Sequence, residues 1–144
     1  MITVTKTVRF DAAHILSDHR GLCRNLHGHT YRVDVSAAGD GTGDMVVDFQ
    51  QLKALATDVI CSRFDHSFIY NSESPGECEI AAVVEKNGMR ATAIPFRSTA
   101  ENLARHFYAE LAPKMPPNAT LKSVKVWETA DNSAEYSQDA IASS

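Results

Sequence analysis

Long hydrophobic runs, paired cysteines and blocks of basic residues are all scarce in this sequence of 144 residues. No run approaches the roughly 18 apolar residues that a membrane-spanning helix needs. The opening stretch, MITVTKTVRF, alternates polar and apolar residues and does not resemble a signal peptide. We therefore expect a cytoplasmic protein that has no membrane partner.

Only three cysteines occur, Cys23, Cys61 and Cys78, and their irregular spacing favours free thiols over a disulfide framework. The 18 acidic residues outnumber the 14 basic ones, and no cluster of Lys and Arg marks a nucleic-acid-binding surface. We expect no nucleic-acid partner. An anionic small substrate is still compatible with this charge, because a few local cations can dominate the field inside a cleft.

The length and the hydrophobic content of 44% suit one buried core and leave too little chain for two domains. There is no internal repeat and no linker. We therefore expect a single catalytic domain over residues 1–144.

Two long strands are predicted near the N-terminus. Residues 2–10 alternate apolar and polar, and the apolar phase reaches His14 if the extended geometry continues. Residues 27–37 alternate in the same way. The glycine-rich stretch AGDGTGD predicts a turn, and MVVDF after it predicts a short strand that completes a hairpin.

Two helices and a second hairpin are predicted in the rest of the chain. Apolar residues at helical spacing follow Asp48 over 49–62 and follow Ser98 as far as residue 111. The runs EIAAVVEK and MRATAI flank an Asn-Gly pair, which predicts a hairpin, and residues 121–128 predict a last strand. This order predicts an α+β fold with helices on one face of an antiparallel sheet.

Three histidines, His14, His27 and His29, share the apolar phase of the two long strands. Each could be an ordinary hydrogen-bonded core histidine. Burying three imidazoles on one apolar face without a shared role is costly, however, and three imidazoles with an open fourth position form a catalytic zinc site. We favour the zinc site, and interpret His19 and His106 as ordinary surface or helix residues.

Other candidates surround the histidines in the sequence. Cys23 precedes His27 by four residues and is either a reactive thiol or a small buried side chain. Asp65 and His66 are adjacent and form either a proton-transfer pair or an ordinary loop.

Glu128 ends the last predicted strand in phase with Val124 and Val126, and a carboxylate there needs a partner. That partner could be an internal arginine, such as Arg9 or Arg32, or the N–H groups of a bound heterocycle.

Five motifs in one order resemble the 6-pyruvoyl-tetrahydropterin synthase and 6-carboxy-tetrahydropterin synthase family. They are FDAAH, CRNLHGHTY, FDH, STAENLA and VWET. The resemblance implies the tunnelling fold (T-fold), an antiparallel sheet with two helices on one face. It also implies a homo-oligomer in which trimers close a β-barrel and pair into hexamers, with active sites at subunit interfaces.

The resemblance also implies roles for the residues that match the family motifs. These are His14, His27 and His29 as ligands of Zn²⁺, Cys23 as general base, Asp65 and His66 as a second proton-transfer unit, and Glu128 as the anchor of the pterin ring. The implied substrate is 7,8-dihydroneopterin triphosphate, with zinc acting as a Lewis acid.

Within the family we expect the carboxy-forming branch, a lyase that releases acetaldehyde and triphosphate on the route to 7-deazaguanine nucleosides such as queuosine. The motif C-x3-H-G-H in a short chain without targeting signals suits that branch. One alternative is the pyruvoyl-forming synthase of tetrahydrobiopterin biosynthesis. An alternative of another class is a non-catalytic T-fold protein that binds zinc or pterin.

The sequence departs from the family pattern in places. The usual Pro-Thr-x-Glu reads Ser-Thr-Ala-Glu from Ser98, which we expect to cap the following helix. The Leu-Asn that often follows Asp-His is replaced by Ile69-Tyr70, which puts substrate contacts there in question. The connection over residues 72–97 is longer than in compact members, and we expect it to alter the rim of the site or an interface.

Overall fold

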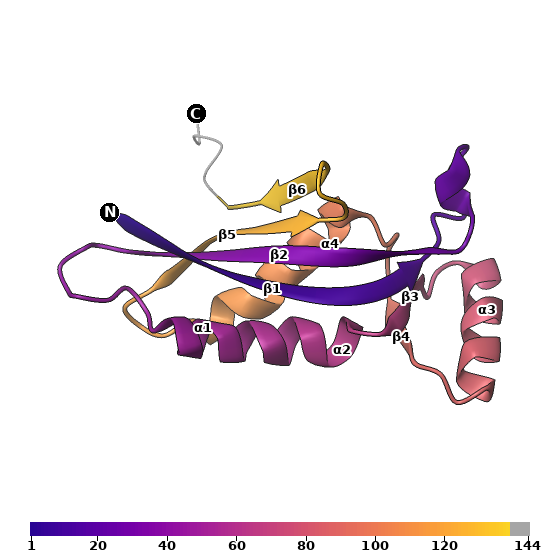
Figure 1. The fold of residues 1–144 in the computed structure, drawn as a ribbon, viewed down its shortest axis with the longest axis horizontal. Helices are drawn as coiled ribbons and strands as arrows, with labels where there is room; N and C mark the ends of the chain where they lie inside the picture. Colours follow the sequence, from indigo (N-terminus) through magenta and orange to yellow (C-terminus); the bar gives the residue numbers. More distant parts are fainter. Residues whose placement is uncertain (139–144) are drawn as a thin grey trace.

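The computed structural model describes residues 1–138, which form a six-stranded sheet in the order β4-β3-β1-β2-β5-β6 (Figure 1). The strands are β1 (Ile2–His14), β2 (His27–Gly39), β3 (Ser67–Asn71), β4 (Ala91–Ile94), β5 (Thr120–Trp127) and β6 (Ser133–Tyr136). The two long strands at the centre are the ones that the alternating pattern predicts, and β1 does continue to His14.

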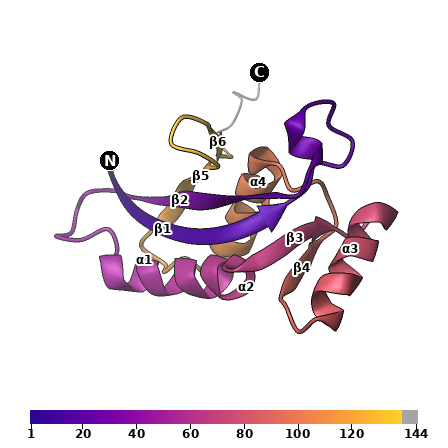
Figure 2. The ribbon, with the colours of Figure 1, turned by 45° about the vertical axis from the view of Figure 1, so that its right-hand side comes forward.

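The helices are α1 (Phe49–Ala56), α2 (Ser62–Phe64), α3 (Pro75–Lys86) and α4 (Ala100–Leu111), with short turns η1 (Leu22–Arg24) and η3 (Ala112–Lys114). A wide π turn, η2 (Thr57–Cys61), joins α1 and α2 into one rod (Figure 2). This rod and α4 pack on one face of the sheet, whereas α3 lies at one end beside β3 and β4. Among the helices of residues 1–138, none combines the length and apolar character needed to cross a membrane.

The antiparallel pairing of β1 with β2 explains the alternating sequence. Its register runs from Ile2 opposite Gly39 to His14 opposite His27. Phe10 and Tyr31 on the core-facing side stack with ring centroids 4.8 Å apart. Polar side chains occupy the other face of these two strands, which we call the open face, because period-two alternation places them there.

The predicted short strand at MVVDF is wrong. Residues 45–48 form an irregular loop before α1, although Val46 and Val47 are buried in the core. Val46 packs so closely on Gly39 that a Cβ on this glycine would lie 3.1 Å from its methyl groups. The burial of these valines is therefore achieved by loop packing and not by a hairpin.

The predicted hairpin around Asn87-Gly88 is also wrong, because its first arm is the helix α3. Ser74 caps this helix by accepting a hydrogen bond from the backbone N–H of Glu77, and Pro75 occupies its first turn. Asn87 ends the helix and Gly88 follows with φ +76°. The Asn-Gly pair therefore marks a helix C-terminus, where glycine suits the left-handed conformation.

The sheet is mixed, which corrects the expectation of a purely antiparallel one. β3 pairs parallel to β1, and β4 pairs parallel to β3, while the remaining pairs are antiparallel. The helical rod carries the chain back along the sheet to the C-terminal end of β1. There β3 begins and runs in the same direction as β1, so the two strands pair in parallel. The edge strand β6 has no counterpart in the sequence-based expectation.

The helix after residue 98 begins one residue later than expected. Thr99, not Ser98, is the N-cap of α4, since its hydroxyl accepts a hydrogen bond from the backbone N–H of Asn102. The side chain of Ser98 is completely buried and contacts a histidine of the candidate site instead.

Candidate functional site

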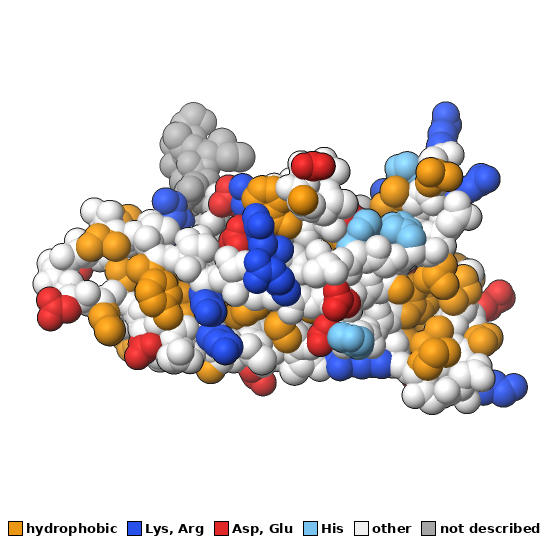
Figure 3. Space-filling model, viewed as in Figure 1, with side chains coloured by type: hydrophobic (Ala, Val, Ile, Leu, Met, Phe, Trp, Pro, Cys, Tyr) orange, Lys and Arg blue, Asp and Glu red, His pale blue; other side chains and the backbone are white. Residues whose placement is uncertain are grey.

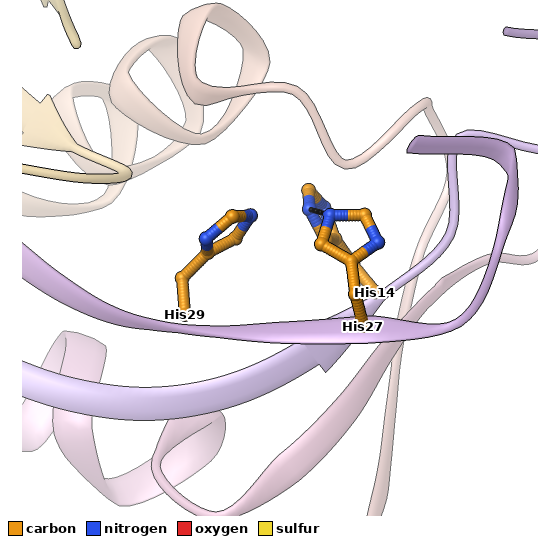
Figure 4. Close-up of side chains that lie close together, drawn as sticks. All are labelled: His14, His27 and His29. Carbon is orange, nitrogen blue, oxygen red and sulfur yellow. Dashed lines mark hydrogen bonds between the residues drawn. The ribbon is translucent and has the colours of Figure 1, made fainter. Parts of the chain in front are cut away.

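The side chains of His14, His27 and His29 converge at one end of the β1–β2 pair, as Figure 4 shows. One ring nitrogen from each lies within 4.8 Å of the others. The Nε2 atoms of His14 and His27 are 3.1 Å apart. We call these residues the histidine cluster. The structure thus brings together the three side chains that the sequence predicts to share a face.

The outer nitrogens of two of these rings are held by backbone carbonyls. His14 Nδ1 donates to the carbonyl of Ser98 at 2.8 Å, and His27 Nδ1 donates to the carbonyl of Asn25 at 2.7 Å. A carbonyl only accepts hydrogen bonds, so Nδ1 of each ring carries a proton and Nε2 is the nitrogen turned toward the other imidazoles. Histidines that bind metals usually donate the N–H of their other ring nitrogen to a carbonyl or a carboxylate in this way.

The geometry of the histidine cluster fits a bound cation. Two Nε2 atoms 3.1 Å apart require a proton or a metal ion between them, because two lone pairs at this distance would repel each other. His29 Nε2 is buried and makes no well-aligned hydrogen bond among residues 1–138, although Glu128 Oε1 lies 3.2 Å away. Imidazole is the ligand that zinc, copper and iron share, so the donor set suits a transition metal.

The carboxylate of Glu128 faces the histidine cluster. Its Oε1 lies 3.2 Å from Nε2 of both His14 and His29. Hydrogen bonding to His14 is the main cause that holds the pKa of Glu128 below its ordinary value, and it outweighs burial. Burial lowers the pKa of His29, against the opposing charge of Glu128, which favours the neutral ring that a metal requires.

The partner of Glu128 is therefore not Arg9 or Arg32, the internal arginines considered from the sequence. Arg32 lies instead over the ring of Trp127, with its guanidinium carbon 4.2 Å from the ring centroid. A cavity of about 460 Å³ opens beside Glu128, between the start of α4 and the turn from β5 to β6. Its lining includes Glu101, Asn132 and Glu135.

Asp65 and His66 form an exposed pair that we call the acid–imidazole pair. Asp65 Oδ1 lies 2.9 Å from His66 Nδ1, and it also accepts the backbone N–H of Asp11 at 2.9 Å. The bond from Asp11 is the main cause that holds the pKa of Asp65 below its ordinary value. His66 adopts φ +56°, a left-handed conformation that is costly for a non-glycine residue and frequent at functional sites.

Residues that the sequence analysis did not single out support this pair. The backbone N–H of His66 donates to the carbonyl of Asp11 at 2.6 Å, and the Asp11 carboxylate accepts the Thr30 hydroxyl at 2.5 Å. Arg90 donates to the carbonyl of Asp65 at 3.2 Å. The signal for Asp11 and Thr30 was present, because both fall in the polar phase of the predicted strands.

The two groups lie on opposite faces of the β1–β2 pair. His14 and His29 share the core-facing phase of the alternation, whereas Asp11 and Thr30, which contact the acid–imidazole pair or each other, share the open face. In Figure 3, histidine surface appears in two separate places, and the lower one lies beside acidic side chains.

The third predicted catalytic residue, Cys23, lies in η1 within the loop that joins β1 to β2. Its carbonyl accepts the backbone N–H of Leu16 at 3.0 Å, which closes this loop. The thiol is half-buried and free. The loop enters β2 at His27, so Cys23 is carried at the same end of the sheet as the histidine cluster.

The remaining histidines lie outside the histidine cluster, as expected. His19 is exposed in a loop, and its Nδ1 accepts the backbone N–H of Gly21. His106 is half-buried on α4 among aromatic rings, with its centroid 5.5 Å from that of Phe96. Cys61 and Cys78 are free and half-buried, and burial raises the pKa of the Cys61 thiol.

Comparison with known proteins gives the family. The sequence profile described as "6-pyruvoyl tetrahydropterin synthase" matches residues 3–139. A protein of Haemophilus influenzae named 6-carboxy-5,6,7,8-tetrahydropterin synthase is 37% identical over 143 residues, covering 96% of this chain and 100% of the relative. A protein of the same name from Aquifex aeolicus is 36% identical and covers 94% of this chain and 98% of its own. The chain belongs to the 6-pyruvoyl tetrahydropterin synthase family.

Solved structures agree with this assignment. The 6-pyruvoyl tetrahydropterin synthase of Caenorhabditis elegans superposes with a TM-score of 0.66 at 27% identity, covering 94% of both chains. An uncharacterized protein of Wolinella succinogenes superposes with a TM-score of 0.82 at 20% identity, covering 96% of this chain and 98% of the other, which shows the shared fold. The fold of residues 1–138 is therefore the T-fold of this family.

Proposed function

We propose that this protein is a lyase that converts 7,8-dihydroneopterin triphosphate to 6-carboxy-5,6,7,8-tetrahydropterin, with release of acetaldehyde and triphosphate. The Haemophilus influenzae and Aquifex aeolicus relatives carry the carboxy-forming name and are 37% and 36% identical to this chain. The observation that carries the proposal is the convergence of three imidazoles, with one ring nitrogen of each within 4.8 Å of the others, in a chain of this family.

The histidine cluster is proposed to hold Zn²⁺. When bound, the ion supplies Lewis-acid polarisation of the oxygens on the side chain of the substrate. The carbonyls of Ser98 and Asn25 orient two of the imidazoles through their Nδ1 atoms. The rings sit on paired strands, so the geometry is preorganised before substrate arrives.

Proton transfer is assigned to Cys23 and to the acid–imidazole pair, and binding of the pterin ring to Glu128. Asp65 orients His66 through Nδ1, which leaves Nε2 free to exchange a proton with substrate. Glu128 borders the cavity beside α4, where its carboxylate can accept two N–H groups of a heterocycle. Fixing the ring there holds its side chain near the imidazoles.

The opposite placement of the histidine cluster and the acid–imidazole pair supports a site shared between subunits. A second copy must bring its own Asp65 and His66 to the substrate held by the first. We propose a homo-oligomer built from trimers that pair into hexamers, as the family resemblance implies. This also gives a role to the exposure of His66, whose side chain is 77% accessible in one chain.

The test of the proposed reaction is product analysis. Zinc-loaded protein incubated with 7,8-dihydroneopterin triphosphate should release one acetaldehyde for each triphosphate and form the 6-carboxy product. Triphosphate release without acetaldehyde would instead identify the pyruvoyl-forming reaction. No turnover, together with retained zinc and pterin binding, would support the non-catalytic alternative.

A cysteine variant tests the catalytic assignment within that assay. Cys23→Ala should lower kcat by about 100-fold to 10,000-fold, the usual contribution of a general base. Zinc content should stay at the parental value, because the three imidazoles are untouched. Cys78→Ala is the matched control and should keep parental activity. Equal rates for Cys23→Ala and the parent protein would refute the role given to this thiol.

A further inference from the structure

The hydroxyl of Tyr31 is the clearest unexplained group near the proposed site. Tyr31 is completely buried, and its hydroxyl has no hydrogen-bond partner among residues 1–138. Buried hydroxyls are almost always paired, since an unpaired one loses its bonds to water without replacement. A protein retains such a group at a cost in stability, which suggests that the hydroxyl is used when a ligand is bound.

The aromatic ring of Tyr31 is held in place by its neighbours. It stacks on Phe10 with an interplanar angle of 11°. Its centroid lies 5.5 Å from that of His29 and 6.0 Å from that of His14, both in edge contacts. A ring packed on these sides cannot swing toward a distant acceptor, so the acceptor must come to the hydroxyl.

Glu128 is the acceptor that can do so. In the β2–β5 register, Arg32 lies opposite Trp127 and Val33 opposite Val126, so the next residues along are Tyr31 and Glu128. Both belong to the core-facing phase, and such cross-strand neighbours are within side-chain reach. Glu128 follows the last residue of β5 and its side chain is 25% accessible, so it has freedom that the tyrosine lacks.

The carboxylate also has capacity for another donor. An ionised carboxylate offers about four acceptor positions. Only Oε1 faces the imidazoles, at 3.2 Å from His14 and His29. A cation bound by the histidine cluster would use those same Nε2 atoms, and the carboxylate would then need other donors. Tyr31 is a buried donor on the same face.

We propose that Tyr31 is a positioning residue of the pterin site, whose hydroxyl donates a hydrogen bond to the carboxylate of Glu128 when Glu128 binds the N–H groups of the heterocycle. This inference rests on the proposed function. Tyr31 would raise the affinity for the pterin by positioning Glu128, and would not contact the substrate itself.

The experiment compares two tyrosines in the same core. Tyr31→Phe removes only the unpaired hydroxyl. Tyr108→Phe is the matched control, because the Tyr108 hydroxyl is also buried but donates to the carbonyl of Leu121 at 3.1 Å. For each zinc-loaded variant, the melting temperature without ligand and the Kd for unsubstituted pterin are measured, the latter by fluorescence quenching.

The two variants should behave in opposite ways. Tyr31→Phe should melt at or above the parental temperature and raise the Kd for pterin about tenfold, the usual consequence of losing one hydrogen bond to a charged group. Tyr108→Phe should melt lower and keep the parental Kd. In a Glu128→Gln background, adding Tyr31→Phe should change the Kd less than twofold, since the two residues act as a unit.

Other outcomes overturn the inference. A lower melting temperature and unchanged Kd in Tyr31→Phe would show that the hydroxyl has a structural partner such as buried water. A tenfold effect that persists in Glu128→Gln would show that Tyr31 does not act through the carboxylate. If the parent protein binds pterin and only the Tyr31 effects fail, the proposed function stands without this inference. A parent protein that binds no pterin overturns both.

Discussion

The histidine cluster and the acid–imidazole pair are built in contrasting ways. The cluster lies on the core-facing side of the two longest strands, and His14 is completely buried. The pair lies on the open face at the junction of α2 and β3, where the side chains of Asp65 and His66 are 40% and 77% accessible. The first group is partly buried by its own chain, and the second is exposed.

This contrast separates what one chain can do alone from what it does with a copy of itself. A metal site needs rigid donors shielded from water, and paired strands provide them within one chain. A proton-transfer group that must meet a substrate bound elsewhere can remain exposed until an interface covers it. The comparison therefore predicts metal binding that depends on one chain and catalysis that depends on two.

The largest expected effect is on metal content. His27→Ala and His29→Ala should each reduce bound zinc from about one ion per chain to near zero. A catalytic zinc site has three protein ligands, and each variant keeps only two of the imidazoles. Metal analysis after dialysis measures this, and His19→Ala, which alters an exposed loop histidine, is the control. Equal loss of zinc in all three variants would contradict the assignment of His27 and His29, but not His19, as metal ligands.

A complementation experiment sharpens the contrast further. His66→Ala should keep its zinc and lose about 100-fold or more in kcat, since it lacks a proton-transfer group. Mixed oligomers formed by unfolding and refolding His66→Ala together with His27→Ala should regain part of the activity, because some interfaces join an intact cluster to an intact pair. Mixtures that stay as inactive as their components would place both groups in one chain.

The smallest expected effect is on stability in acid. The pKa of Asp65 is lower in the folded protein than in the unfolded chain, so its carboxylate stabilises the fold above its ordinary pKa of about 3.9. That contribution should be lost as the pH falls from about 5 through the lowered pKa. Urea midpoints between pH 6 and pH 3 should therefore decline less steeply in Asp65→Asn than in the parent, whereas Asp44→Asn, in an exposed loop, should match the parent.

The sequence anticipated the elements whose pattern is long and regular. β1 and β2 follow a period of two over many residues, so their faces and the convergence of the histidines could be predicted. The helix predicted over 49–62, which the structure forms as α1 and the π turn that follows it, and α4 both begin at a cap and place apolar residues at helical spacing. In these segments local preference and tertiary burial agree, which makes prediction reliable.

Short segments with ambiguous signals were predicted wrongly. The Asn-Gly pair at 87–88 suits both a hairpin and a helix C-terminus, and only the cap at Ser74 with Pro75 favours the helix. The apolar run at 45–49 suits a strand, but the close approach of Val46 to Gly39 leaves it as a packed loop. At 45–49, packing against a residue of the preceding strand decided between two locally acceptable conformations.

The amino-acid sequence by itself determined the family, the long strands, and which side chains share a face, because these depend on residue type and on the fixed period of a strand. Only the tertiary structure decided that Glu128 faces the imidazoles, that Tyr31 lacks a partner, and that the acid–imidazole pair lies across the sheet from the histidine cluster. Those relations depend on the register of the strands and on which strand ends lie side by side. Contacts between residues far apart in the sequence determine both.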